Sequence, residues 1–219
     1  MSSVDTMSIM GEAFVELAAQ SPLEKISVSD IVAASGKNRK TFYYHFEDKS
    51  HLIRWIFRSD LAEVLHDRFD EEHLVYENPQ DPGSMPELPY YAFRKSGVRS
   101  LDGSEFVRAL ADTLQKRPEY YGKALRGVEP DGLRAYLVRL YVPAFEKDIR
   151  FILSNRSLDR ANVKFLAEFY AGALVSYLAT KAASPATSHD LLHDMGPFGN
   201  IIHSSMENEI KEQQMRRSF

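Results

Sequence analysis

The chain has 219 residues, 44% of them hydrophobic, and its 31 acidic residues outnumber its 27 basic ones, for a formal net charge of −4. This length suffices for a small domain plus a larger one, or for a single large domain, and the apolar fraction can supply a core. The sequence contains no cysteine, which excludes disulfide bonds and thiolate chemistry.

The sequence carries no recognisable targeting or membrane-spanning segment. Residues 2–8 are polar and lack the basic region and apolar core that a signal peptide requires. The longest apolar run covers roughly residues 170–179, which is far too short to cross a bilayer. We therefore expect a soluble, cytoplasmic protein.

The first predicted helix covers about residues 7–19 and is expected to pack on the segment that follows. Ser21 and Pro22 end it, because proline has no backbone donor and disfavours helix in the preceding residue. Its apolar residues recur on one side at helical spacing. They are Ile9, Ala13, Phe14, Leu17 and Ala18.

A short second helix is predicted to begin near Val28. Ser27 is a suitable N-cap, and Asp30, three residues later, completes a variant capping box. Val28, Ile31 and Ala34 then form a narrow apolar stripe that can face a core.

A third helix is predicted after a tight turn. Gly36 can adopt the left-handed conformation that stops a helix, and Asn38 suits the N-cap of the next one. Phe42 and Phe46, spaced i and i+4, are predicted to point inward. The outward side chains are basic, hydroxyl-bearing or aromatic. They are Arg39, Lys40, Thr41, Tyr43, Tyr44 and His45.

These two short helices have the layout of a DNA-reading helix-turn-helix. Arginine and lysine can pair with phosphate oxygens or guanine edges, and threonine and tyrosine hydroxyls can donate to phosphates and bases. The alternative is a solvated face with incidental charge, but exposed tyrosines beside basic residues are an unusual way to cover a surface. The sequence therefore predicts double-stranded DNA as a partner.

Charge is distributed unevenly along the chain. Between residues 37 and 58, six basic residues stand against two acidic ones, although the whole chain is acidic. A local positive excess fits one DNA-facing surface on an otherwise acidic body. The six basic residues are Lys37, Arg39, Lys40, Lys49, Arg54 and Arg58.

This part of the sequence closely resembles the DNA-binding domain of TetR/AcrR-family transcription regulators. The resemblance extends without gaps from Ala13 to about Phe57. The segments that carry it are residues 25–31, 35–36, 41–46 and 48–49.

The resemblance implies that Lys49 contacts a DNA phosphate. We expect Ser27 and Lys49 together to hold the DNA backbone. The family usually has an apolar residue, often valine, directly after the turn glycine. Lys37 occupies that position here and is a further candidate DNA contact.

A longer helix is predicted over about residues 49–69, and it can connect the DNA-binding domain to the rest of the chain. Residues 70–103 are rich in proline and glycine, and a loop of this length is unusual inside a compact domain. One interpretation is a lid over a ligand pocket. The other is a solvated linker with an aromatic anchor. Three aromatic residues of this segment, Tyr90, Tyr91 and Phe93, are expected to fold back on the body of the protein.

Helical patterns return after this segment, and no alternating strand pattern competes with them anywhere. The predicted helices cover residues 105–116, 118–125, 133–153 and 158–183. The sequence thus predicts an all-α fold. A three-helix helix-turn-helix DNA-binding domain would span residues 1–57, and an all-helical effector-binding and dimerisation domain would span residues 58–219, including the irregular residues 70–103.

The small residues Ala171, Gly172 and Ala173 lie in an apolar helix and would let another helix approach closely. In the family the last two long helices form a dimer bundle. Residues 165–178 resemble the first of that pair, especially in the branch that includes activators of dihydroxyacetone kinase operons. An intrachain core helix would explain the same residues. A homodimer is favoured, because one helix-turn-helix reads too few base pairs for useful specificity.

The region between residues 192 and 201 contains Gly196, Pro197 and Gly199, and is expected to form a kink or two short helices. His189 and His193 are spaced i and i+4, which could place two imidazoles on one metal ion. No third ligand is identifiable, and a polar helix surface explains them better. No phosphate loop or dinucleotide fingerprint is present. We expect no enzyme activity, no bound metal and no cofactor.

The predicted function is a homodimeric, ligand-responsive repressor that binds a palindromic operator. One alternative is an activator whose C-terminal domain binds a protein coactivator. Another is a ligand-binding or metal-binding helical module without DNA binding. Candidate walls of an effector pocket are the large, mostly aromatic residues of the C-terminal helices. They are Phe106, Leu110, Tyr120, Tyr121, Tyr136, Tyr141, Phe145, Phe169 and Tyr170.

Overall fold

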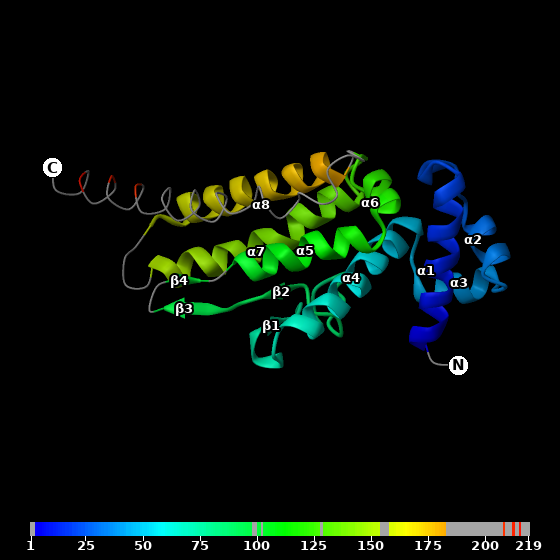
Figure 1. Ribbon diagram of the computed structural model, residues 1–219, viewed down its shortest axis with the longest axis horizontal. Coiled ribbons are helices and arrows are strands. Elements are labelled where there is room, and N and C mark those ends of the chain that lie inside the picture. The colour runs from blue at the N-terminus through cyan, green and yellow to red at the C-terminus, as the bar shows by residue number, and fades with distance from the viewer. Residues whose placement is uncertain are drawn as a thin grey trace.

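A computed structural model describes residues 3–97, 100–101, 103–127, 129–153 and 158–182, together with positions 208, 212 and 215. Eight long or short α-helices account for most of these described ranges, which confirms the predicted all-α fold (Figure 1). Their bounds are α1 Ser3–Gln20, α2 Val28–Ala34, α3 Arg39–His45, α4 Lys49–Arg68, α5 Ser104–Lys116, α6 Pro118–Ala124, α7 Leu133–Leu153 and α8 Arg160–Ala182.

Helices α1, α2 and α3 gather at one end of the molecule (Figure 1). Helix α1 begins four residues earlier than predicted, and it packs on α2, α4 and α6. Its residues Met10 and Phe14 are fully buried together with Ile31 of α2 and Phe42 of α3. Burial of these apolar side chains is the main force that holds three short helices together.

Helix α4 joins this end to the rest of the molecule and matches its predicted bounds within one residue. Asp48 caps it by accepting a hydrogen bond from the backbone N–H of His51 at 2.6 Å. Its 20 residues extend over about 30 Å at 1.5 Å per residue. The helix packs on α1 and also on α5 and α7. It is therefore shared between the end that carries α1 to α3 and the C-terminal helices.

Residues 70–103 contain short strands, which the sequence did not predict. Strand β1 (Leu74–Val75) pairs antiparallel with β2 (Tyr91–Ala92), and β3 (Lys95–Gly97) pairs with β4 (Ser100–Leu101). Strands of two or three residues are too short to show the period of two that marks a strand in sequence. A 3₁₀ helix, η2 (Glu71–His73), precedes β1, as η1 (Leu23–Lys25) precedes α2.

The aromatic residues of this segment fold back on the helices, as predicted. Tyr90 and Tyr91 are buried and Phe93 is half-buried against the core. Arg58 of α4 is fully buried and forms hydrogen bonds with this segment. It donates to the backbone carbonyl of Met85 at 3.1 Å, to the carbonyl of Leu88 and to the carboxylate of Glu77. The segment is thus fastened to α4 and does not form a free loop.

Helices α7 and α8 lie side by side and make the largest helix pair of the described chain (Figure 1). The bounds of α5, α6, α7 and α8 agree with the predicted helices within two residues. Helix α6 is short and packs between α1 and α8. The predicted break between residues 192 and 201, and the pair His189 and His193, lie outside the described residues.

Candidate nucleic-acid interface

The start of α2 is fixed by a capping box, as the sequence predicted. The backbone N–H of Asp30 donates to Oγ of Ser27 at 3.2 Å, and the backbone N–H of Ser27 donates to Oδ2 of Asp30 at 2.8 Å. These bonds satisfy two backbone donors that the helix end would leave unpaired. The hydrogen bonds from the side chain and backbone of Ser27 also hold the pKa of the Asp30 carboxyl below its ordinary value.

The turn between α2 and α3 also follows the prediction. Gly36 has a φ of +65°, the left-handed region that glycine enters without a steric penalty. Asn38 then caps α3, because its Oδ1 accepts from the backbone N–H of Thr41 at 2.9 Å and from the Thr41 hydroxyl at 3.2 Å. The start of the recognition helix α3 is therefore set by local chemistry.

The inner face of α3 fixes its rotation. Phe42 and Phe46 are buried, as predicted, and their rings lie 5.5 Å apart between centroids. The Phe46 ring meets Trp55 of α4 edge to face at 5.8 Å. Such aromatic contacts add to the burial of apolar area and are directional. Helix α3 is thereby held against α4 with one defined face turned outward.

That outward face carries the predicted side chains. Arg39, Lys40, Tyr43 and Tyr44 are exposed, and Tyr44 retains 81% of its accessible surface. Thr41 and His45 are half-buried at the edges of the face. A helix with one face of arginine, lysine and tyrosine presents the groups that contact phosphates and base edges in a major groove.

Arg39 is held in place by two neighbours. Its Nη1 donates to Oγ of Ser29 in α2 at 3.0 Å, and its guanidinium lies 5.9 Å from the ring centre of Tyr43. The sequence alone did not reveal the contact between Ser29 and Arg39. It joins two helices across a turn, so no local spacing indicates it. The contacts with Ser29 and Tyr43 restrict the Arg39 guanidinium before any DNA is bound, which lowers the conformational entropy lost on binding.

Lys49, which the family resemblance predicts to contact a DNA phosphate, is hydrogen-bonded within the protein. Its ammonium donates to the carbonyl oxygens of Leu23 at 2.7 Å and Ile26 at 2.9 Å. Partial burial lowers the pKa of this ammonium. These bonds tie the turn before α2 to the first turn of α4.

Arg58 does not belong to the predicted basic surface. Arg58 was counted in the basic excess of the DNA-reading segment, yet it is fully buried and its guanidinium also donates to the Tyr136 hydroxyl at 2.9 Å. It cannot face DNA. The helical pattern allowed either orientation, and only the contact with residues 77–88 determines which one occurs.

Most of the predicted pocket walls are buried, and six of them belong to one large hydrophobic core, with Phe145 packed against it. These six are Phe106, Leu110, Tyr120, Tyr121, Tyr136 and Tyr141. At one end of this set the Tyr120 ring of α6 meets Phe14 of α1 at 6.0 Å. Elsewhere in the same core Tyr141 makes ring contacts with Phe106 and Phe145. Tyr170 is buried on α8.

Beside these rings lies a buried polar pair, Tyr91 and Asp148, that the sequence did not reveal. Tyr91 lies 4.4 Å from Phe106 between ring centres, and its hydroxyl donates to Oδ2 of Asp148. Burial raises the pKa of Asp148 to about 7. Among the described residues, Oδ1 of Asp148 and the hydroxyl of Tyr141 are buried without a hydrogen-bond partner.

The assignment of Phe169 to an internal pocket is wrong. Phe169 is 58% exposed on α8, and its ring is stacked on Phe165, which is 65% exposed, at 6.2 Å between centres. Its neighbour Tyr170 is buried. Successive residues of a helix point about 100° apart, so the burial of Tyr170 turns Phe169 toward the surface.

Two general properties of the described chain also bear on function. Within the described ranges, no group of three or more histidine, aspartate or glutamate side chains could hold a metal ion. In the same part of the chain, every helix is too short or too polar to cross a membrane.

Residues 12–55 match the model of a family described as bacterial regulatory proteins, tetR family. A curated relative, the HTH-type dhaKLM operon transcriptional activator DhaS of Lactococcus lactis subsp. lactis (strain IL1403), is 38% identical over 68 residues. That match covers 31% of this chain and 36% of the relative, so it spans about a third of the relative's length.

A solved structure, the dihydroxyacetone kinase operon activator DhaS, is similar over nearly the whole chain. The alignment covers 93% of this chain and 97% of that one, with a TM-score of 0.54 and 17% sequence identity. At this identity the likeness concerns the fold. It extends the similarity from the N-terminal helices to the C-terminal ones.

Proposed function

We propose that this chain, whose N-terminal helices form a DNA-binding domain of the TetR family, is a homodimeric transcription regulator that responds to an effector. Residues 1–57 would bind DNA, and residues 58–219 would bind the effector and dimerise. One observation supports this most directly. Helix α3 exposes Arg39, Lys40 and Tyr44 on one face while Phe42 and Phe46 anchor the opposite face.

In this proposal α3 enters the major groove of an operator. Arg39, already restrained by Ser29, would contact a base edge. Lys40, Thr41, Tyr43, Tyr44 and His45 would complete the contacts to bases and phosphates, with Ser27 and Lys37 at the rim. Asn38 contributes through the cap of the helix.

The dimer interface in this proposal is formed by α8. Phe165 and Phe169 are exposed and stacked, and they form an apolar patch on a helix surface. One to two turns further, a Cβ atom at Gly172 would have no neighbour within 4 Å among the described residues. An open glycine beside exposed aromatic rings is suited to a helix from a second copy. Two-fold pairing would place two α3 helices on a palindromic site.

The effector in this proposal binds near Tyr91, Tyr141 and Asp148. Buried polar groups are normally hydrogen-bonded, so Oδ1 of Asp148 and the Tyr141 hydroxyl are suited to accept or donate to a ligand. The rings of Phe106 and Phe145 supply apolar walls beside them. An effector would regulate by making different contacts in two arrangements of the dimer.

Repression is the simplest mode for such a regulator, because a bound dimer blocks access to its operator. Activation is the second candidate. The curated relative is named as a transcriptional activator of the dhaKLM operon, and the similar solved structure is named as a dihydroxyacetone kinase operon activator. An activator could bind a protein coactivator through its C-terminal helices in place of a small effector.

The deciding experiment measures binding to the DNA upstream of the protein's own gene by fluorescence anisotropy, at two salt concentrations, with a scrambled duplex as control. We expect saturable binding that is stronger for the genuine sequence and weaker at high salt. Arg39→Ala should weaken it by about 1–3 kcal/mol. Arg150→Ala, which removes an exposed arginine in the last turn of α7, at the end of that helix away from α1 to α3 (Figure 1), is the matched control. Equal and weak binding to both duplexes would count against the proposal.

A further inference from the structure

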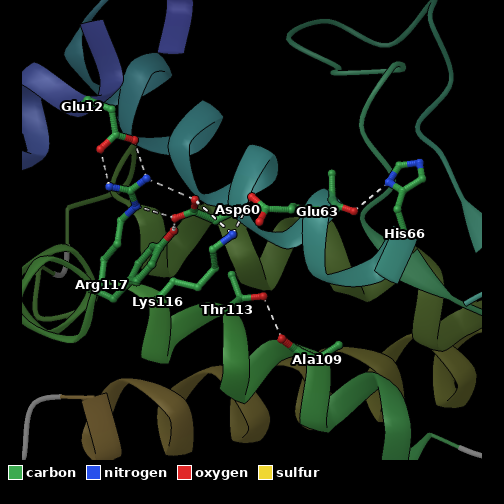
Figure 2. A network of polar contacts seen from close by, with 10 residues as sticks. Glu12, Asp60, Glu63, His66, Ala109, Thr113, Lys116 and Arg117 are labelled. Atoms are coloured by element: carbon green, nitrogen blue, oxygen red, sulfur yellow. Dashed lines mark hydrogen bonds and ion pairs between the residues drawn. The ribbon is translucent and has the colours of Figure 1, made fainter. Parts of the chain in front are cut away.

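Arg117 lies at the junction of α5 and α6 and binds two other helices at once (Figure 2). Its Nη1 donates to Oε2 of Glu12 in α1 at 2.8 Å, and its Nη2 donates to the other oxygen of the same carboxylate. Its Nε donates to Oδ2 of Asp60 in α4 at 2.9 Å. One guanidinium therefore joins α1, α4 and the α5–α6 junction.

The two ion pairs differ in exposure. The Asp60 side chain is only 8% exposed, and it also accepts from the Tyr121 hydroxyl at 2.5 Å. The Glu12 side chain is 57% exposed. Breaking a buried pair is costly because it leaves an uncompensated charge, whereas a solvated carboxylate separates from its partner at little cost. Arg117 should thus stay on Asp60 and release Glu12 first.

Two further contacts hold α1 against α6. The ammonium of Lys123 donates to the backbone carbonyl of Ala18, in the last turn of α1. The Tyr120 ring packs against Phe14 between these two polar contacts. A cation at the carboxyl end of a helix is favourable, because the last carbonyls there lack intrahelical partners. Helix α1 is thereby held against α6 over its residues 12–18.

The opposite side of α6 touches α8. A Cβ atom at Gly122 would lie 2.7 Å from the carbonyl oxygen of Ala182, so only glycine allows this approach to the end of α8. Helix α6 is therefore packed between α8, which carries the exposed Phe165 and Phe169, and α1, which supports the DNA-reading helices. A shift of α8 would push directly on α6.

We propose that Arg117 is a positioning residue for DNA recognition, and that α6 transmits displacements of α8 to α1 through the releasable contact between Arg117 and Glu12. This inference rests on the proposed function, since it concerns the spacing of two α3 helices in a dimer. In this inference, α4 and α1 both transmit the displacement to the DNA-reading helices. Formation of the Glu12 contact narrows the range of positions open to the DNA-reading helices.

The chain contains no cysteine, so a spin label can be placed at a single introduced site. Ala33→Cys puts one label on the exposed surface of α2 in each protomer, and pulsed electron resonance then reports the distance between the two copies. In that background Glu12→Gln removes the charge that Arg117 binds. Glu16→Gln changes an exposed glutamate one turn along the same helix and is the matched control.

We expect Glu12→Gln to broaden the distance distribution while Glu16→Gln leaves it unchanged. Operator binding should weaken by up to about fivefold, the factor that corresponds to a partly exposed ion pair. The thermal unfolding midpoint of Glu12→Gln should lie no more than about 4 °C below that of Glu16→Gln, so that both variants are folded at the temperature of the measurement. Identical distributions for parent, Glu12→Gln and Glu16→Gln would overturn the inference and leave the proposed function intact.

A second measurement needs neither a dimer nor DNA. Amide hydrogen exchange should quicken along α1 in Glu12→Gln and not in Glu16→Gln, because α1 loses one of its attachments to α6. If the parent shows no distance between protomers and no operator binding, the proposed function fails. In that case, unchanged exchange along α1 would also overturn the role of Arg117, whereas faster exchange would support it.

Discussion

The ammonium of Lys49 lies 2.7 Å from the carbonyl oxygen of Leu23 and donates a hydrogen bond to it. The same ammonium reaches the carbonyl of Ile26 at 2.9 Å. A lysine at the first turn of a helix is poorly placed for the helix dipole, so its partners must come from elsewhere. Here they come from the turn that leads into α2. Lys49 thus sets the entry of the helix-turn-helix, and its effect on DNA can be indirect.

Lys49→Met tests this role. We expect the free energy of unfolding to fall by about 1–2 kcal/mol, because two carbonyls lose a charged donor. The salt dependence of DNA binding should keep its slope, since no phosphate contact is removed. Lys40→Met is the control, and it should lower the slope by about 1 without lowering stability. A lower slope with unchanged stability in Lys49→Met would return the residue to the phosphate contacts.

Ser29→Ala tests whether Arg39 is held in place before it meets DNA. The Ser29 hydroxyl accepts from Nη1 of Arg39 at 3.0 Å, and its loss frees the guanidinium to adopt other rotamers. We expect operator affinity to fall by about 0.5–1 kcal/mol, less than for Arg39→Ala. Anisotropy titrations measure this. Ser29→Thr keeps the hydroxyl and should bind like the parent, and a matching loss in Ser29→Thr would contradict this explanation.

Arg58→Met tests the attachment of residues 77–88 to α4. The variant removes the cation that pairs with the Glu77 carboxylate, which keeps only the backbone N–H of Met85 as a donor at 2.9 Å, and it leaves the buried carbonyl of Met85 without its donor. We expect the free energy of unfolding to fall by about 3 kcal/mol. Urea denaturation gives this value. Arg54→Met, one turn earlier on the same helix and only half-buried, should cost far less. Equal costs would show that the attachment contributes little.

Local chemistry explains why much of the N-terminal fold was predictable from the sequence. Ser27 and Asn38 cap their own helices, and Gly36 ends α2 by its own backbone freedom. Each of these contacts joins residues at most three positions apart. The periodic burial of Phe42 and Phe46 follows from the same short range.

The features that the sequence did not reveal depend on residues far apart in the chain. Arg58 meets Tyr136 across 78 positions, and Tyr91 meets Asp148 across 57. No periodic pattern encodes such pairs, and a buried arginine has the same letter as an exposed one. Phe169 shows the reverse case. An apolar residue in an apolar helix was assigned to the interior, although its neighbour Tyr170 occupies the buried side.

Asp148 predicts a pH dependence of stability. Burial raises its pKa from 3.8 to about 7, against smaller opposing effects of the Tyr91 hydrogen bond and of Lys147. The folded state therefore holds this proton more tightly than the unfolded state. The resulting stabilisation is complete below about pH 4 and is lost as the pH rises through about 7. The slope reaches at most about 1.4 kcal/mol per pH unit.

Asp148→Asn should flatten this dependence and raise stability at pH 8, because no charge remains to be buried. Urea unfolding at several pH values measures it. Asp67→Asn changes an exposed aspartate on α4 and should follow the parent at every pH. A parent-like slope in Asp148→Asn would mean that another group titrates in this range.

Phe169→Glu tests the dimer interface on α8. The exposed, stacked rings of Phe165 and Phe169 form the apolar patch that a second copy would cover, and a dimer places a carboxylate from each chain in that contact. A central aromatic anchor contributes about 2 kcal/mol or more, so the dimer Kd should rise at least about 30-fold. Sedimentation analysis over a concentration series measures the shift from dimer to monomer. Val4→Glu alters an equally exposed apolar residue on α1, 64% accessible, and should leave the Kd unchanged.

Because one helix-turn-helix binds DNA weakly, the Phe169 variant should also lose operator binding at concentrations where it is monomeric, while its circular dichroism stays that of a folded helical protein. A variant that remains dimeric would remove α8 from the interface.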